Sequence, residues 1–306
     1  MESAICLDIG GTFVKYGLVD PEGRVTMAGR QRTSIAGRDA LLCQVFMIIE
    51  ELLTDAGNGG VAGIGIASAG QVSHEAGVVL SATGNLPGWS GVRLKEIVED
   101  RFSIACHIDN DVKCAALGEL FFGSGRQYND FLCMTIGTGV GGAIVCNGRL
   151  LRGTDGIAGE IGHIILHKGG RSCNCGCFGC YEQYASVSSL MKTVSDTLGS
   201  DYIPADAGAE WLFAQNGMDS RLNDILDAYA EDIAAGIASL VHVLNPEAVI
   251  IGGAISSCKL LMDLVGEKVI RNVMPIFQRS LKVLPALTGN NASILGVSTY
   301  LFSPCA

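Results

Sequence analysis

The sequence predicts an α/β protein of two domains, in which a strand, a glycine-rich turn and a second strand form a repeated unit. The chain has 306 residues, 48% of them hydrophobic, and a mean hydropathy of +0.36, enough apolar material for more than one core. The unit occurs once in each half, at residues 8–19 and 131–146. This pair suggests a duplicated fold that clasps one polyphosphate between its domains, although two unrelated hairpins would give the same pattern.

Charge and hydropathy argue against several classes of protein. A formal net charge of −10 and a pI near 4.9 disfavour a nucleic-acid partner, which would select clustered lysine and arginine. The apolar stretch 41–53 is interrupted by Gln44, Glu50 and Glu51, so we expect no membrane span. Because no basic start and apolar run of the signal-peptide kind opens the chain, we expect a cytoplasmic protein.

The chain opens on a predicted β-hairpin with strands at 4–9 and 14–19. Backbone N–H groups and a threonine hydroxyl in its turn could bind a phosphate, and a carboxylate there could hold Mg²⁺ through water. These candidate ligands are Asp8, Gly10, Gly11 and Thr12. A plain turn without a ligand is the alternative.

The next predicted elements belong to the first domain. Apolar residues at helical spacing predict a helix over 39–53, with Gly57 as its stop. A strand is expected at 61–67, and the turn that follows it lies where ligands gather in open α/β sheets. Turn residues predict a loop over 83–89, in which Asn85 either binds a hydroxyl or simply forms the turn.

A strand at 104–108 should deliver Asp109, Asn110 and Asp111 to the start of a helix over 112–122. Carboxylates at a helix N-terminus are commonly caps. A carboxylate facing a cleft is also what a hydroxyl nucleophile needs to lose its proton. The residues alone leave cap and base open.

The second repeat contains a formal GxGxxG pattern after a strand at 131–136. A dinucleotide-binding fold would require a helix next, but residues 143–146 indicate a strand, and Asn147 with Gly148 is a hairpin turn signal. We therefore reject the Rossmann interpretation. Strand, glycine turn and strand remain, as in the first repeat.

Residues 156–182 carry the densest chemistry of the chain. Thiolates and an imidazole at this spacing suit a tetrahedral Zn²⁺, with Gly176 and Gly179 letting the backbone wrap around it. Five residues compete for four places: His163, Cys173, Cys175, Cys177 and Cys180. A site closed by four protein ligands is structural, and disulfides or free thiols are the alternatives. Glu160 and Glu182 flank the cysteines and either hold a polyhydroxylated ligand or are solvated charges.

The last third supports the fold. A long amphipathic helix is expected at 220–244, a strand at 248–251, a helix at 259–277 that stops or kinks near Pro275, and a final helix at 292–302.

Five motifs together resemble those of the ROK family of sugar kinases. They are DIGGTFVKYG at 8–17, NDVKCAALGE at 110–119, GTGVGGAIVCNGRLLRG at 137–153, GIAGEIGH at 156–163 and CNCGCFGCYE at 173–182. The resemblance spans essentially the whole chain. It implies the actin-like ATPase (ribonuclease H-like) duplicated fold, with two α/β domains and a central cleft. The implied domains are 1–115 plus 291–306, and a larger one at 116–290 with the zinc-binding loop.

The resemblance also implies residue roles. Asp111 would be the general base, and the sugar ligands would be Asn85, Asn110, Glu160, His163 and Glu182. Asp8, Gly10, Gly11 and Thr12 resemble the first phosphate loop, Thr138 and Gly139 the second, and Gly252 and Gly253 the segment against which adenosine packs. Zinc would be held by His163, Cys173, Cys175 and Cys180, with Cys177 at a variable position.

The implied activity is ATP-dependent phosphorylation of a hexose or N-acetylhexosamine, at the 6-hydroxyl. Mg²⁺ and a structural Zn²⁺ are the implied metals, and a homodimer is expected. Glucose and N-acetylmannosamine are the leading substrates, ahead of fructose, mannose, allose and β-glucosides.

The sequence departs from the family's pattern at three positions, and two other functions are alternatives to a kinase. Lys113 stands where the family usually has Asn, Ala69 where Pro is common, and Ala143 where Gly is frequent. The resemblance implies that repressors of the family carry a DNA-binding module before the first hairpin, and because seven residues precede Asp8, we expect no such module here. A non-catalytic sugar sensor without that module is the alternative to a kinase.

Overall fold

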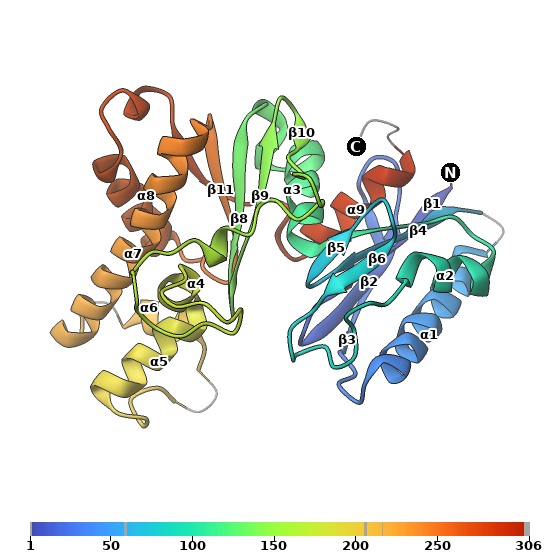
Figure 1. Ribbon diagram of the computed structural model, residues 1–306, viewed down its shortest axis with the longest axis horizontal. Coiled ribbons are helices and arrows are strands. Elements are labelled where there is room, and N and C mark those ends of the chain that lie inside the picture. The colour runs from blue at the N-terminus through green and yellow to red at the C-terminus, as the bar shows by residue number, and fades with distance from the viewer. Residues whose placement is uncertain (1, 58–59, 205–206, 216, 303–306) are drawn as a thin grey trace. The chain divides into compact units, whose positions relative to one another are not determined.

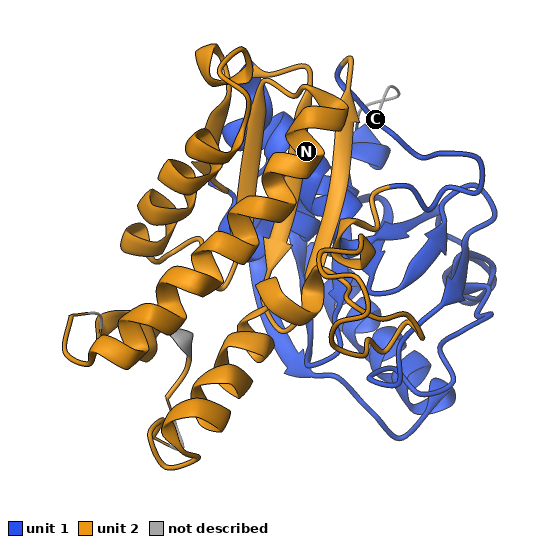
Figure 2. Cartoon of the chain, turned by 60° about the vertical axis from the view of Figure 1, so that its left-hand side comes forward, with its two compact units in different colours: residues 1–127, 148–158, 287–306 blue, residues 128–147, 159–286 orange. Residues whose placement is uncertain are grey.

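The computed structural model describes residues 2–57, 60–204, 207–215 and 217–302. The chain divides into two compact units (Figure 2). The first comprises residues 1–127, 148–158 and 287–306, and the second residues 128–147 and 159–286. The chain therefore passes from one unit to the other four times. The domain boundaries predicted from the sequence stay a prediction.

A five-stranded sheet, in the order β3-β2-β1-β4-β7, forms the centre of the first unit (Figure 1). Its strands are β1 (Ser3–Ile9), β2 (Phe13–Val19), β3 (Val25–Arg32), β4 (Val61–Ser68) and β7 (Cys106–Asn110). The first two strands pair antiparallel, which confirms the opening hairpin, whereas β1, β4 and β7 run parallel. A small hairpin of β5 (Gln71–Ser73) and β6 (Val78–Ser81) stands apart from this sheet.

Helices cover this sheet because its central strands are apolar on both faces. The helices are α1 (Arg38–Ala56), α2 (Leu94–Phe102), α3 (Asp111–Phe122) and α9 (Ala292–Phe302). Leu41, Val45, Ile48 and Leu52 form one buried stripe of α1 and pack in the same core as Ile5 of β1.

Helices α3 and α9 pack closely against each other, because each has a glycine at the contact. A Cβ on Gly296 would overlap the carbonyl of Cys114, and one on Gly118 would overlap the carbonyl of Ala292. The close packing fixes α3, whose first residue is Asp111, to the C-terminal helix.

The other five-stranded sheet has the order β10-β9-β8-β11-β12, and its strands β8, β9, β11 and β12 belong to the second unit. Its strands are β8 (Phe131–Ile136), β9 (Val140–Cys146), β10 (Arg149–Leu150), β11 (Ala248–Gly253) and β12 (Lys282–Pro285). The antiparallel pairing of β8 with β9 confirms the second strand, glycine turn and strand. Asn147 and Gly148 both have positive φ angles, as a two-residue hairpin requires.

The helices of the second unit are α4 (Glu182–Ala185), α5 (Val187–Leu198), α6 (Ala209–Ala214), α7 (Ser220–Leu244) and α8 (Lys259–Asn272). Helix α7 begins and ends where its periodicity predicted. The helix predicted over 259–277 is too long, because the chain leaves helical geometry at Val273, with φ −89° and ψ 151°. Pro275 disfavours helical geometry at the residue before it, and Phe277–Arg279 forms a separate 3₁₀ turn. Among the described residues no helix could cross a membrane.

Candidate functional site

The corner between β7 and α3 holds Asn110 and Asp111 in a network of short hydrogen bonds. The Asn110 amide oxygen accepts the backbone N–H groups of Val112 and Lys113, each at 3.0 Å, and so caps α3. Its Nδ2 donates to the Gly70 carbonyl and to Asp111 Oδ1, each at 2.9 Å. These four bonds use both donors and both acceptor sites of the amide.

Asp111 is therefore held rigidly while remaining partly exposed. Its Oδ1 also accepts the Val112 N–H at 2.9 Å, so two donors fix the carboxylate at the N-terminus of α3. Both bonds fix the orientation of the carboxylate. A fixed, partly exposed carboxylate is what a general base requires.

The turn of the first hairpin places Asp8 beside a lysine that the sequence reasoning missed. Lys15 Nζ lies 3.6 Å from Asp8 Oδ2. Burial raises the pKa of Asp8, and the Lys15 charge partly offsets this rise. The pair could have been found from the predicted hairpin, since Asp8 and Lys15 stand opposite each other in its register.

The same turn lies next to Asn85. A Cβ on Gly11 would come within 3.1 Å of the Asn85 side chain, so the predicted phosphate loop and the predicted sugar loop meet in the first unit. The turn is kept in shape by the Gly10 N–H, which donates to the Phe13 carbonyl at 3.0 Å, and by the Thr33 hydroxyl, which donates to the Gly10 carbonyl at 2.6 Å.

In the second unit, the turn between β8 and β9 contacts Glu182. Glu182 Oε2 accepts the Val140 N–H at 3.0 Å. A Cβ on Gly139 would come closer than 3.0 Å to the same oxygen, so any residue other than glycine would displace the carboxylate. The structure thus brings the predicted phosphate loop, with Thr138 and Gly139, against a predicted sugar ligand.

The ends of β8 and β11 lie side by side in the second sheet. Gly253 pairs with Ile136, the last residue before the β8–β9 turn, and Gly252 pairs with Thr135. A Cβ on Gly253, whose φ is 83°, would overlap the Ile136 carbonyl. The segment predicted to face adenosine therefore neighbours the turn predicted to hold phosphate.

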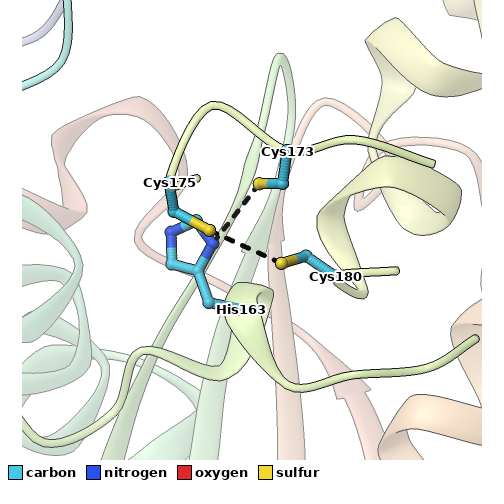
Figure 3. A group of neighbouring side chains, drawn as sticks. All are labelled: His163, Cys173, Cys175 and Cys180. Atoms are coloured by element: carbon cyan, nitrogen blue, oxygen red, sulfur yellow. Dashed lines mark hydrogen bonds between the residues drawn. The ribbon is translucent and has the colours of Figure 1, made fainter. Parts of the chain in front are cut away.

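His163, Cys173, Cys175 and Cys180 converge on one point (Figure 3). Their ligand atoms all lie within 4.8 Å of one another. Cys173 Sγ is 3.7 Å from His163 Nδ1, and Cys175 Sγ is 3.5 Å from Cys180 Sγ. Gly176 and Gly179 have φ angles of 90° and 78°, and they let the chain fold back on itself between the cysteines.

This donor set fits a tetrahedral zinc ion. With Zn–S bonds of about 2.3 Å and Zn–N bonds of about 2.0–2.1 Å, neighbouring ligand atoms should lie roughly 3.5–3.8 Å apart, as the two pairs do. Cys177 is exposed and lies outside the group. Zinc, when bound, would close the loop rather than activate water.

Glu160 and His163 sit together at the edge of this cluster. His163 Nε2 lies 3.9 Å from Glu160 Oε2, while Nδ1 faces Cys173. One imidazole nitrogen therefore points to the candidate metal centre and the other to a carboxylate that is 43% exposed. This geometry allows His163 to serve both predicted roles, metal ligand and sugar ligand.

The comparison with known proteins identifies the family. The ROK family model matches residues 4–302. This chain belongs to the ROK family. It is 32% identical to the glucokinase of Thermotoga maritima, over 97% of this chain and 96% of that protein. The fold is the predicted actin-like, ribonuclease H-like one, shared with a ROK glucokinase of Streptomyces griseus solved with glucose and AMPPNP, at 29% identity, a TM-score of 0.85 and coverage of 97% and 98%.

The family also includes candidate kinases for other sugars and regulators. A candidate N-acetylmannosamine kinase from Listeria monocytogenes is 27% identical, with a TM-score of 0.85 and 98% coverage of both chains. The xylose repressor of Bacillus spizizenii is 26% identical over 97% of this chain and 76% of that protein. Membership alone therefore does not separate a kinase from a regulator.

Proposed function

We propose that this ROK protein is an ATP-dependent sugar kinase that transfers the γ-phosphoryl group to the 6-hydroxyl of a hexose. The observation that carries the proposal is the β7–α3 corner, where Asp111 is oriented by two hydrogen bonds and remains partly exposed. A repressor that only senses a sugar has no need of an oriented base. The kinship with glucokinases supports the same conclusion.

In the proposed reaction, Asp111 takes the proton of the sugar hydroxyl as the oxygen attacks the γ-phosphorus. Phosphoryl transfer passes through a loose transition state, so positioning and charge neutralisation account for most of the catalysis, and a base contributes about 10²–10⁴-fold. Asn110 acts mainly by orienting Asp111, because its amide reaches a sugar only by giving up one of its four bonds.

The phosphates of ATP are proposed to bind at the two glycine turns. Asp8 would hold Mg²⁺ through water, and Lys15 beside it would add positive charge near the phosphates. Thr138 and Gly139 would offer the second turn, with adenosine against Gly252 and Gly253. When bound, Mg²⁺ would neutralise the charge that develops on the transferred group.

The sugar is proposed to bind to carboxylates on the zinc-pinned loop and to Asn85. Glu160 and Glu182 accept hydrogen bonds from ring hydroxyls, and His163 Nε2 donates one. Glucose is the first candidate and N-acetylmannosamine the second, because relatives of both kinds align along nearly the whole chain.

ATP consumption across hexoses and N-acetylhexosamines tests the proposal. We expect turnover with glucose or N-acetylmannosamine and a 6-phosphate product, identified by NMR. Asp111→Asn keeps the shape of the side chain and should lower kcat by about 10²-fold or more while sugar affinity, measured by calorimetry, changes little. Asp100→Asn, the same change on the exposed face of α2, is the control.

A regulator is the second candidate, favoured by the alignment with the xylose repressor. It predicts sugar binding without ATP turnover for every sugar in the panel. Turnover that survives Asp111→Asn would instead leave the kinase activity standing and refute the assignment of the base.

A further inference from the structure

The segment Gly148–Ala158 is the part of the first unit that lies between two stretches of the second unit along the chain. It folds into a loop closed by the Ala158 N–H, which donates to the Arg152 carbonyl at 2.9 Å. Gly153 and Gly156 have φ angles of 70° and 78°, so its path depends on left-handed backbone. Glu160, a proposed sugar ligand, follows two residues after it.

Arg152 ties the beginning of this loop to β7. Its Nη2 donates to Asp109 Oδ2 at 2.9 Å and to the Tyr300 hydroxyl at 2.7 Å, and Tyr300 in turn donates to Asp109 Oδ2 at 2.6 Å. Asp109 is fully buried and stands two residues before Asp111. The Asp109 carboxylate of this ion pair is desolvated and accepts two hydrogen bonds, so the pair forms a firm anchor.

Lys113 ties the other end of the loop to α3. Its side chain is buried, with 4% of the residue exposed, and its Nζ donates to the Gly156 carbonyl. Its backbone N–H donates to Asn110 Oδ1 at 3.0 Å. Lys113 therefore contacts both the loop and the cap that orients Asp111.

The position of Lys113, taken by itself, lowers the free energy of unfolding. A cation in the first turn of a helix opposes the helix dipole, and burial of an ammonium group removes its hydration. Asp109 and Lys113 bracket Asp111 at two residues on either side, and both hold the same loop. The loop is therefore held on both sides of the backbone that carries Asp111.

We propose that Lys113 is a positioning residue for phosphoryl transfer, which holds the loop of residues 152–158 against the turn of α3 that carries Asp111. This inference rests on the proposed kinase activity and deepens it. Through Asn110, Lys113 keeps Asp111 in place. Through the Gly156 carbonyl, it fixes the backbone that leads to Glu160. Loss of the tie affects the base and the sugar ligand together.

Lys113→Met tests the proposal, because methionine has a similar length but no donor. We expect kcat to fall and the KM for the sugar to rise, with kcat/KM lower by about tenfold or more. Lys113→Arg, which keeps the cation and can donate to the same carbonyl, should recover part of kcat. If Lys113→Met does not fold, Lys113→Leu, which also lacks a donor, takes its place with the same expectation for kcat and KM.

Lys268→Met is the matched control. Lys268 is the other lysine with less than a tenth of its surface exposed among the described residues, with 6% exposed, and it pairs with Asp227 and Glu231 between α7 and α8. We expect this control to lower the melting temperature while kcat and KM stay close to those of the wild type. Lys113→Met that behaves in the same way would overturn the proposal.

Hydrogen exchange separates this inference from the kinase proposal. The Ala158 amide, bonded to Arg152, should exchange faster in Lys113→Met than in Lys268→Met whether or not any sugar is phosphorylated. Unchanged exchange at residues 152–158 would overturn the tie. A wild-type protein that phosphorylates no sugar would refute the kinase activity alone. The exchange result would still test whether Lys113 holds the loop of residues 152–158.

Discussion

Gly139→Ala should damage the candidate site through a single added methyl group. Gly139 lies in the β8–β9 turn, and its φ angle is outside the left-handed region, so the backbone tolerates alanine. The new Cβ would come closer than 3.0 Å to Glu182 Oε2, a separation that real Cβ atoms essentially never show. Because the adjacent Val140 N–H donates to the same oxygen, the carboxylate must move or the turn must shift.

The expected size of the effect follows from this overlap. An ordinary contact between carbon and oxygen is about 3.3 Å, so the Glu182 carboxylate has to retreat by nearly 1 Å. The retreat weakens a hydrogen bond to a charged group, which contributes about 1.5–3 kcal/mol, and a misplacement of about 1 Å can cost about 10²-fold in rate. We therefore expect kcat/KM to fall by about 10- to 100-fold, with a higher KM for the sugar.

Steady-state kinetics with ATP and the sugar measure this loss, and Gly137→Ala is the matched control. Gly137 belongs to the same turn, its φ is likewise outside the left-handed region, and a Cβ there would meet nothing within 4 Å. Equal kinetic constants for the two variants would refute the reasoning, because the two substitutions differ in the contact with Glu182.

The remaining predictions concern the metal centre and acid stability. Cys175→Ser should lose zinc, measured by metal analysis, and should have a higher KM for the sugar. Cys177→Ser should keep the zinc and the wild-type KM, because Cys177 lies outside the group of ligands. An active, metal-free Cys175→Ser variant would contradict the structural role of zinc. Hydrogen bonds from Asn272, then from Arg271 and Lys268, lower the pKa of Glu231 from 4.5 to about 2. A depressed carboxylate pKa stabilises the fold above the unfolded pKa, and this contribution is lost as the pH falls from about 4.5 to about 2. Since the Glu231 side chain is 41% exposed, we expect only about 1 kcal/mol, seen as a stability difference between wild type and Glu231→Gln that vanishes across this range. A difference that stays constant with pH would exclude the ionised carboxylate as its source.

The sequence predicted the elements that depend on local chemistry. The opening hairpin, the second strand, glycine turn and strand, and the helices at 220–244 and 292–302 agree with the structure, because alternation, helical spacing and turn residues act over short distances. The spacing of the cysteines also predicted a metal-ligand cluster with five candidates, while the set of His163, Cys173, Cys175 and Cys180 came from the family resemblance.

Long-range contacts could not be predicted in this way. The Asp109–Arg152 pair and the bond from Lys113 to Gly156 each join residues 43 positions apart, and no local pattern announces such a partner. The identity of the cap at the β7–α3 corner also needed coordinates. Asn110 caps the helix, and its Nδ2 donates to Asp111 Oδ1.

Glu182 connects two parts of the second unit that the sequence presents as separate motifs. It follows Cys180 by two residues, so a metal bound at the candidate centre would fix its backbone, and its Oε2 accepts the N–H of Val140 in the turn that contains Gly139. We therefore expect a structural change at the candidate metal centre or at the β8–β9 turn to move the Glu182 carboxylate. Loss of zinc should therefore weaken the binding of ATP as well as that of the sugar, while Gly139→Ala should disturb the sugar and leave zinc in place. A metal-free protein with reduced sugar affinity but unchanged ATP affinity would show that the glycine turn keeps its shape without Glu182.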